Sequence, residues 1–233
     1  MKRFFLFASV ALLMIIFQTS CSMGDNGGTT NPQQGSFLMA NVSPDAPSLN
    51  ISVNNSLLTQ GFSFGSYTPY YSAVAGVYAL SFTKTDNTSV LSNSINVEAN
   101  KAYSYILIDS FNTIKSTFFE DRLVVPTGDS VHIRFFNFSP DSQPFNLRDS
   151  VAGKVLYKQR TFSDQDYITS YINFIKIPAG DYTFQLQNQD KDSTVAASKL
   201  YSLMPGHIYT LFAKGFVEGS GAQAIGLGQI QNF

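Results

Sequence analysis

The side chains best suited to bind a partner are tyrosines that gather in two segments of the chain. Tyr67, Tyr70 and Tyr71 share a short stretch that is also rich in glycine. Tyr167 and Tyr171 hold a similar place in the second half. Tyrosines on loops can stack on sugar rings or anchor a protein partner, because they combine a large apolar ring with a polar hydroxyl. The alternative is that these rings pack beneath a long connection, and the absence of tryptophan weakens the sugar-binding hypothesis.

Histidines and carboxylates offer little for catalysis or for metal binding. The two histidines, His132 and His207, lie 75 residues apart, with neither a His-Glu-x-x-His nor a Gly-x-Ser-x-Gly motif. Alternation along the chain places His132 and Arg134 on the solvent face of a strand. A carboxylate pair for glycoside hydrolysis is defined by a spatial distance, and the sequence gives no sign of one. The sequence therefore predicts no enzyme, no catalytic residue, no metal and no cofactor.

The tripeptide Ser-Pro-Asp occurs twice and ends at Asp45 and at Asp141. Each carboxylate could offer a ligand to Ca²⁺, which prefers oxygen donors. Proline fixes φ, however, and aspartate accepts hydrogen bonds from the backbone that follows it. We interpret both tripeptides as turns at the ends of strands.

The N-terminal segment has the features of an export signal. A basic start precedes 14 mostly apolar residues, 4–17, and this run is shorter than the about 20 residues that a spanning helix needs. Cys21, the sole cysteine, resembles the lipid-modified first residue of a bacterial lipoprotein, although Gln18 stands where such signals usually carry an aliphatic residue. The alternative is an ordinary secretory signal cut near Ser20. We predict a signal peptide over residues 1–20 and a lipid anchor on Cys21.

The composition of the mature chain argues against nucleic-acid binding and against a disulfide, and it predicts a flexible N-terminal tether. Cleavage after residue 20 leaves 13 basic and 16 acidic residues, a formal net charge of −3, so we expect no nucleic-acid binding. One cysteine cannot form an internal disulfide. Residues 21–36 are rich in Gly, Asn, Thr and Gln, and we interpret them as a flexible tether with an end-to-end distance of about 20 Å.

From Phe37 onward the sequence repeats itself. The matching segments are Asn41–Ile51 with Asn137–Leu147, Ala75–Phe82 with Ala179–Leu186, and Ile95–Leu107 with Tyr201–Ala213. In the second copy Tyr182, Phe184 and Leu186 alternate with polar residues, which is typical of half-buried antiparallel strands.

The repeat predicts two tandem β domains, a first repeat over residues 37–126 and a second over 127–233, joined by a turn-rich link. Tight turns at Ala99–Asn100 and Pro205–Gly206 separate two strand-like runs in each copy. We interpret these turns as hairpins.

The order of three motifs resembles the DUF4397 family, whose domains have no known function and often occur in tandem in bacterial envelope proteins. The motifs are Ser-Pro-Asp-Ala-Pro at 43–47, Ala-Gly-x-Tyr at 75–78 and Ala-Asn-Lys-Ala-Tyr at 99–103. The second copy departs from them at Gln143 and His207. The resemblance implies antiparallel β-sandwich-like domains of the Ig-like or Greek-key type, with no established activity. The composition also resembles lipoproteins of the Bacteroidetes.

These patterns together predict a non-catalytic envelope lipoprotein that binds a glycan or a protein partner. We expect it at the outer membrane, held through the lipid on Cys21, with its orientation toward the periplasm or the cell surface left open. Two alternatives remain: a structural spacer without a ligand, and a carbohydrate-active enzyme with an unrecognised carboxylate pair.

Overall fold

The computed structural model of the chain describes residues 33–189 and 193–233. The predicted signal peptide, Cys21 and most of the predicted tether lie outside these residues. The first strand begins at Gln34, so the last three residues of the predicted tether already belong to a sheet. Gln34 pairs with Val74, and the amide of Ser36 donates to the carbonyl of Lys101, which explains why this polar segment is ordered.

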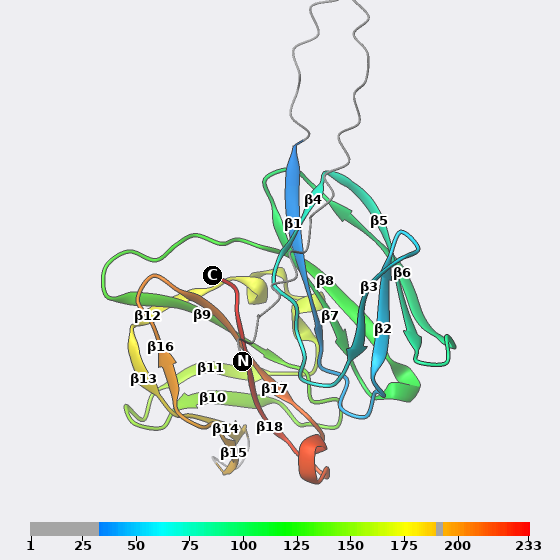
Figure 1. The fold of residues 1–233 in the computed structure, drawn as a ribbon. Coiled ribbons are helices and arrows are strands. Elements are labelled where there is room, and N and C mark those ends of the chain that lie inside the picture. Colours follow the sequence, from blue (N-terminus) through cyan, green and yellow to red (C-terminus); the bar gives the residue numbers. More distant parts are fainter. Residues whose placement is uncertain (1–32, 190–192) are drawn as a thin grey trace, which may run out of the picture. The chain divides into compact units, whose positions relative to one another are not determined.

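Within the described residues the chain forms eighteen strands and four 3₁₀ turns of three or four residues (Figure 1). The strands are β1 (Gln34–Asn41), β2 (Leu49–Val53), β3 (Ser56–Phe62), β4 (Tyr71–Val74), β5 (Gly76–Lys84), β6 (Ser89–Val97), β7 (Ala102–Ile108), β8 (Lys115–Asp121), β9 (Ser130–Asn137), β10 (Phe145–Asp149), β11 (Val155–Arg160), β12 (Ile175–Pro178), β13 (Gly180–Tyr182), β14 (Phe184–Asn188), β15 (Thr194–Ala197), β16 (Tyr201–Leu203), β17 (Ile208–Lys214) and β18 (Gly226–Gln231). The turns are η1 (Phe111–Thr113), η2 (Asp164–Asp166), η3 (Thr169–Ile172) and η4 (Gly221–Gln223). The prediction of an all-β, sandwich-like fold is confirmed. In this part of the chain no helix is long and apolar enough to cross a membrane.

The strand order shows the duplication that the sequence suggests. In the first repeat the sheets run β4-β1-β7-β8 and β3-β2-β5-β6. In the second repeat the matching sheets run β12-β9-β17-β18 and β11-β10-β14-β15, with a small β13-β16 pair beside them. The described residues between β8 and β9, 122–129, form no strand.

The hairpins expected at Ala99–Asn100 and Pro205–Gly206 are wrong. β6 pairs with β5, whereas β7 pairs with β1 and β8 in the other sheet, so the turn between them carries the chain across the sandwich. The turn residues Asn100 and Gly206 have φ angles of 61° and 79°, a left-handed conformation that asparagine and glycine adopt most readily. A strand-turn-strand pattern is the same for both connections, so the sequence alone could not separate them.

A second feature that the sequence does not show is parallel pairing at the centre of two sheets. β1 runs parallel to β7, and β9 runs parallel to β17, while the other ladders between described strands are antiparallel. These four strands are buried on both faces along most of their length. Their near-continuous apolar sequences agree with this, because a strand covered on both sides has no polar face.

Three apolar cores explain why both faces are covered. The first lies between the two sheets of the first repeat, and the second lies between the sheets of the second repeat. The third joins the repeats: Leu38 and Ile106 of the first repeat belong to the same buried cluster as Phe136, Phe212 and Ile230 of the second. The described residues 33–189 and 193–233 accordingly belong to one compact unit. The division at residues 126 and 127 stays a prediction.

The shared core overturns the expected place of Arg134. Alternation put this side chain on a solvent face, but it is 0% exposed. The reason is that the face of β9 opposite Val131 and Ile133 is covered by the first repeat instead of by water.

Candidate functional site

A surface groove lies where the connection between β3 and β4 meets the end of β18. Its volume is about 520 Å³, within the range of small-molecule sites. We call it the ring groove. Its lining residues are Tyr67, Pro69, Tyr70, Gln231, Asn232 and Phe233.

The connection from Ser63 to Tyr70 is held in place by backbone hydrogen bonds to β1. The amide of Asn41 donates to the carbonyl of Ser66, and the amide of Thr68 donates to the carbonyl of Met39. The Thr68 hydroxyl in turn accepts from the Met39 amide at 3.0 Å. Tyr67, which bridges to β1 between these anchors, is 46% exposed. Its ring is therefore presented to solvent from a fixed backbone.

The opposite wall of the ring groove is fixed by β17. The amide of Asn232 donates to the carbonyl of Ile208, and the amide of Ile208 donates to the carbonyl of Phe233. The Phe233 ring is 56% exposed, whereas Asn232 is buried. Two exposed rings therefore face a groove in which the exposed side-chain amide of Gln231 can offer hydrogen bonds.

A buried polar network lies behind the ring groove. The Tyr70 hydroxyl donates to Asp121 Oδ2 at 2.6 Å, and Ser104 Oγ donates to the same oxygen at 2.7 Å. Asn232 Nδ2 donates to the Tyr70 hydroxyl at 2.9 Å, and Thr210 Oγ1 donates to Asn232 Oδ1 at 2.6 Å. The groove-lining Tyr70 and Asn232 are thus held by residues from both repeats.

Arg134 completes this network. Its Nη2 donates to Asp121 Oδ1 at 2.5 Å, and its Nε donates to Thr210 Oγ1 at 2.8 Å. The guanidinium also lies 4.4 Å from the ring centroid of Phe174, a cation–π distance. Both charges are fully buried, so each depends on the other and on its hydrogen bonds for stabilisation.

The network keeps the Tyr70 hydroxyl protonated. Burial raises the pKa of Tyr70 far above its ordinary value, and the negative charge of Asp121 raises it further. The hydroxyl donates a hydrogen bond to Asp121 and accepts one from Asn232. Tyr70 therefore acts as a neutral, oriented part of the groove floor.

The structure separates the five tyrosines that the sequence singled out. Tyr67 and Tyr70 share the ring groove, whereas Tyr71 lines another hollow beside Phe37, with a ring-centroid distance of 6.3 Å. Tyr167 is 83% exposed and follows η2. Tyr171 lies in η3.

Tyr171 covers a second buried ion pair. Its ring centroid lies 4.0 Å from the guanidinium of Arg160, which donates to the Asp164 carboxylate and to the carbonyl of Phe135. The neighbouring Asp166 accepts a hydrogen bond from Thr117 of β8. Tyr171 therefore packs on the Arg160–Asp164 ion pair, while the nearby Asp166 makes the contact with the first repeat.

The two Ser-Pro-Asp tripeptides form turns, but their carboxylates reach farther than expected. Asp45 Oδ1 accepts from the amide of Phe111 at 2.7 Å, and Asp141 Oδ1 accepts from the amide of Val217 at 2.9 Å. Phe111 follows β7 and Val217 follows β17, which are equivalent strands of the two repeats. The aspartates thus fasten equivalent distant loops, which the sequence interpretation of a local turn missed.

The structure brings the two histidines together although 75 residues separate them. The amide of His132 donates to the carbonyl of His207 at 3.0 Å, because β9 and β17 are parallel neighbours. The His207 ring makes a separate contact through Nδ1, 3.0 Å from the Pro205 carbonyl. In the described part of the chain, no group of three or more His, Cys, Asp or Glu could hold a metal ion.

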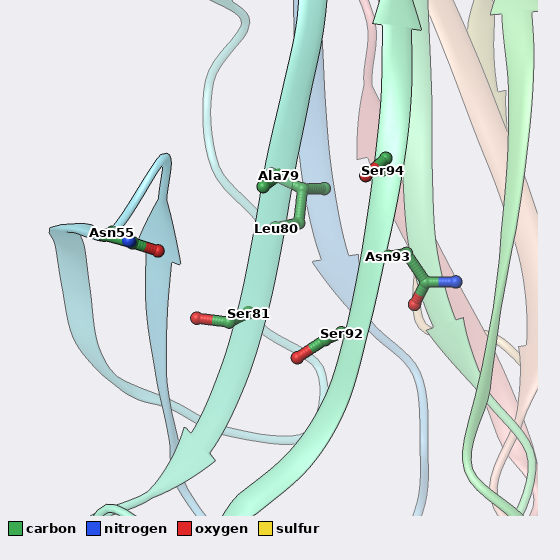
Figure 2. A pocket seen from close by; sticks show the side chains of 7 residues that line it. All are labelled: Asn55, Ala79, Leu80, Ser81, Ser92, Asn93 and Ser94. Carbon is green, nitrogen blue, oxygen red and sulfur yellow. The ribbon is translucent and has the colours of Figure 1, made fainter.

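A further hollow lies on the β3-β2-β5-β6 sheet (Figure 2). Ser81 and Ser92 face each other across β5 and β6 and present hydroxyls, while Asn55 stands at the β2–β3 turn. Leu80 is buried, and Asn93 Oδ1 accepts from the Tyr105 hydroxyl at 3.0 Å. No aromatic ring is among the described residues that line this hollow, so it lacks a stacking surface.

No local pattern marks Gln231, Asn232 and Phe233 as groove residues, because the groove forms only when the end of β18 meets a loop about 160 residues earlier. A signal for the buried network does exist. Arg134 interrupts a run that is otherwise apolar from Ile133 to Phe136, and a charge in a doubly covered strand requires a buried partner.

Comparison with known families adds a domain assignment. The family described as a domain of unknown function (DUF4397) matches residues 37–148. The DUF4397 match takes in β2 to β9 and most of β1 and β10, so it extends from the first repeat into the second. No curated protein matches the chain.

Two solved structures show weak similarity. One is described as "Alpha-glucan binding by a streptococcal virulence factor". It is 11% identical, with a TM-score of 0.24, and the match covers 76% of this chain and 92% of that chain. The other is described as "Alpha-glucan recognition by family 41 carbohydrate-binding modules from streptococcal virulence factors". It is 9% identical, with a TM-score of 0.26, and the match covers 83% of this chain and 96% of that chain. TM-scores this low establish neither a shared fold nor a shared ligand.

Proposed function

We propose that the chain is a non-catalytic carbohydrate-binding module of the bacterial cell envelope, tethered to the outer membrane by a lipid on Cys21. The observation that carries the binding role is the ring groove. Exposed rings of Tyr67 and Phe233 line it together with the exposed side-chain amide of Gln231. Sugars present apolar C–H faces and polar hydroxyls, which rings and amides respectively complement.

Rigidity supports this role. Tyr70 and Asn232 are locked by hydrogen bonds to Asp121 and Thr210, and Tyr67 lies between backbone anchors to β1. A preformed site loses little conformational entropy when it binds, so even a shallow groove can gain useful affinity.

The test is binding of the mature protein to an array of neutral and acidic oligosaccharides, followed by titration calorimetry on the oligosaccharides that bind. Tyr67→Ala should weaken binding about tenfold, because an aromatic contact contributes roughly 1–1.5 kcal/mol beyond area burial. Tyr167→Ala is the matched control, since it removes an even more exposed tyrosine outside the groove.

An array without a bound glycan would overturn the carbohydrate role. Equal losses in Tyr67→Ala and Tyr167→Ala would show that the ring groove is not the binding site. Hydrolysis of a bound oligosaccharide would favour the carbohydrate-active enzyme over the binding module.

A further inference from the structure

A pocket lined by two lysines lies farther along β18 from the ring groove. It has a volume of about 260 Å³, and we call it the lysine pocket after Lys199 and Lys214, which both line it. Lys214 is the last residue of β17, and Lys199 lies between β15 and β16. Gly228 also lines the pocket, and the Phe212 ring packs directly against it across the ladder, where any side chain would clash with the ring.

The lysine pocket and the ring groove share the same two segments. Gly65 lines the pocket, and Tyr67 of the same connection lines the groove. On β18, Gln229 lines the pocket and Gln231 lines the groove. Two residues of a strand span about 7 Å, so one elongated ligand can occupy both.

The charges of the lysine pocket are not neutralised within it. Among the described residues that line it there is no Asp or Glu. Neither Lys199 nor Lys214 forms an ion pair with any described residue. Partial burial lowers the pKa of Lys214, and repulsion from Lys199 lowers it further. The negative charge of an anion between the two amines would offset both effects, because it favours the protonated amines.

The position of Lys214 is defined by its packing. Its Nζ lies 4.9 Å from the centroid of the Phe64 ring, a cation–π contact that holds the amine beside the pocket. Phe64 belongs to the connection that also presents Tyr67, so the cation and the stacking ring are placed by one segment.

We propose that the lysine pocket binds an anionic substituent, a carboxylate or a sulfate or phosphate ester, on the glycan whose sugar ring stacks on Tyr67. This inference rests on the proposed function and names its ligand class: an acidic oligosaccharide or polysaccharide. Charge-assisted hydrogen bonds from two lysines select the anion, while the ring groove binds the sugar to which it is attached.

The test compares acidic glycans with neutral forms of the same backbone. Oligogalacturonate is titrated against its methyl ester, which changes only the carboxylates. Methyl-esterified chondroitin sulfate oligosaccharide is titrated against its desulfated, methyl-esterified form, which changes only the sulfates, so that the two arms separate carboxylate from sulfate. The acidic form should bind about tenfold more tightly, and this preference should decline as salt concentration rises. Inorganic phosphate alone should compete weakly, because it makes no contact in the ring groove.

Two double variants locate the effect. Lys199→Met with Lys214→Met should remove the preference for the acidic form and retain binding of the neutral form. Lys158→Met with Lys176→Met is the control, since it removes the same charge from β11 and β12 and should leave the preference unchanged.

Equal affinity for acidic and neutral forms would overturn this inference and leave the proposed function intact. Equal losses in both double variants would also overturn it, because the preference would then reflect net charge. Competition by phosphate as strong as that by the acidic glycan would overturn it as well, because it would indicate a site for a free anion. Absence of binding to every glycan would overturn the proposed function and this inference together.

Discussion

Substitution of Arg134 by methionine tests whether the buried network holds the two repeats together. Arg134→Met retains much of the side-chain volume but removes the cation that faces Asp121 and the hydrogen bond to Thr210. Asp121 remains buried, with only the hydroxyls of Tyr70 and Ser104 as donors. Breaking a buried pair in this way costs about 3–5 kcal/mol, because it leaves an uncompensated charge.

The expected loss is large enough to measure by two methods. Urea unfolding followed by circular dichroism should show a lower midpoint with an unchanged slope. For a chain of this size, the midpoint of thermal unfolding should fall by roughly 2–4 °C for each kcal/mol of lost stability, or by about 6–20 °C in all. The matched control is Glu98→Gln, which breaks an exposed pair with Lys101 and should leave the urea midpoint almost unchanged, because solvent screens exposed charges.

A double variant isolates the charge effect. Asp121→Asn alone leaves Arg134 buried without a charged partner, but together with Arg134→Met it leaves neither partner charged. The pair should therefore cost clearly less than the sum of the two single changes. A loss below about 1 kcal/mol for Arg134→Met, or strict additivity in the double variant, would refute the account of a coupled buried pair.

Three further predictions address pH, loop attachment and the anchor. Burial raises the pKa of Tyr105 to about 12 and that of Tyr201 to about 12, against about 10 in the unfolded chain. The stability that these two neutral hydroxyls contribute is therefore complete below pH 10 and is lost as pH rises through 12. Absorbance titration of the phenolates and alkaline unfolding should show this loss, and ionisation of all tyrosines near pH 10 would contradict it. Asp45→Ala should cost about 1.5–3 kcal/mol and speed hydrogen exchange at the Phe111 amide, whereas unchanged exchange would show that the loop does not depend on this bond. Cys21→Ser should release the protein from the membrane fraction, and mass spectrometry of the wild-type N-terminus should find lipid on Cys21; an unmodified terminus or a membrane-bound variant would contradict the anchor.

The repeat was the part of the fold most accessible from sequence. Local patterns around Asn41 and Asn137 match because both asparagines make the same contact. The buried side-chain amide of each donates to a carbonyl at the end of the third strand of its repeat, Phe62 or Arg160. Alternation in Tyr182, Phe184 and Leu186 also predicted a strand region correctly, although Thr183 separates β13 from β14. Such signals are local, and strand periodicity expresses them directly.

The candidate site was accessible only in part. Tyr67 and Tyr70 stood out by residue type, but sequence could not show that Tyr70 points toward a buried carboxylate while Tyr67 faces solvent. Tyr171 carries the same side chain and packs on Arg160 instead. Residue type indicates what a side chain can do, whereas its surroundings decide which of these contacts it makes.

The sequence by itself determined the β character, the internal duplication and the acidic, low-charge composition, because each depends on residue type and short-range periodicity. Only the tertiary structure decided that β1 pairs with β7 in parallel, that Arg134 lies in a core shared by both repeats, and that the same two segments line the lysine pocket and the ring groove. These features join residues separated by tens to more than a hundred positions. Their formation depends on how sheets stack, and no local pattern encodes that choice.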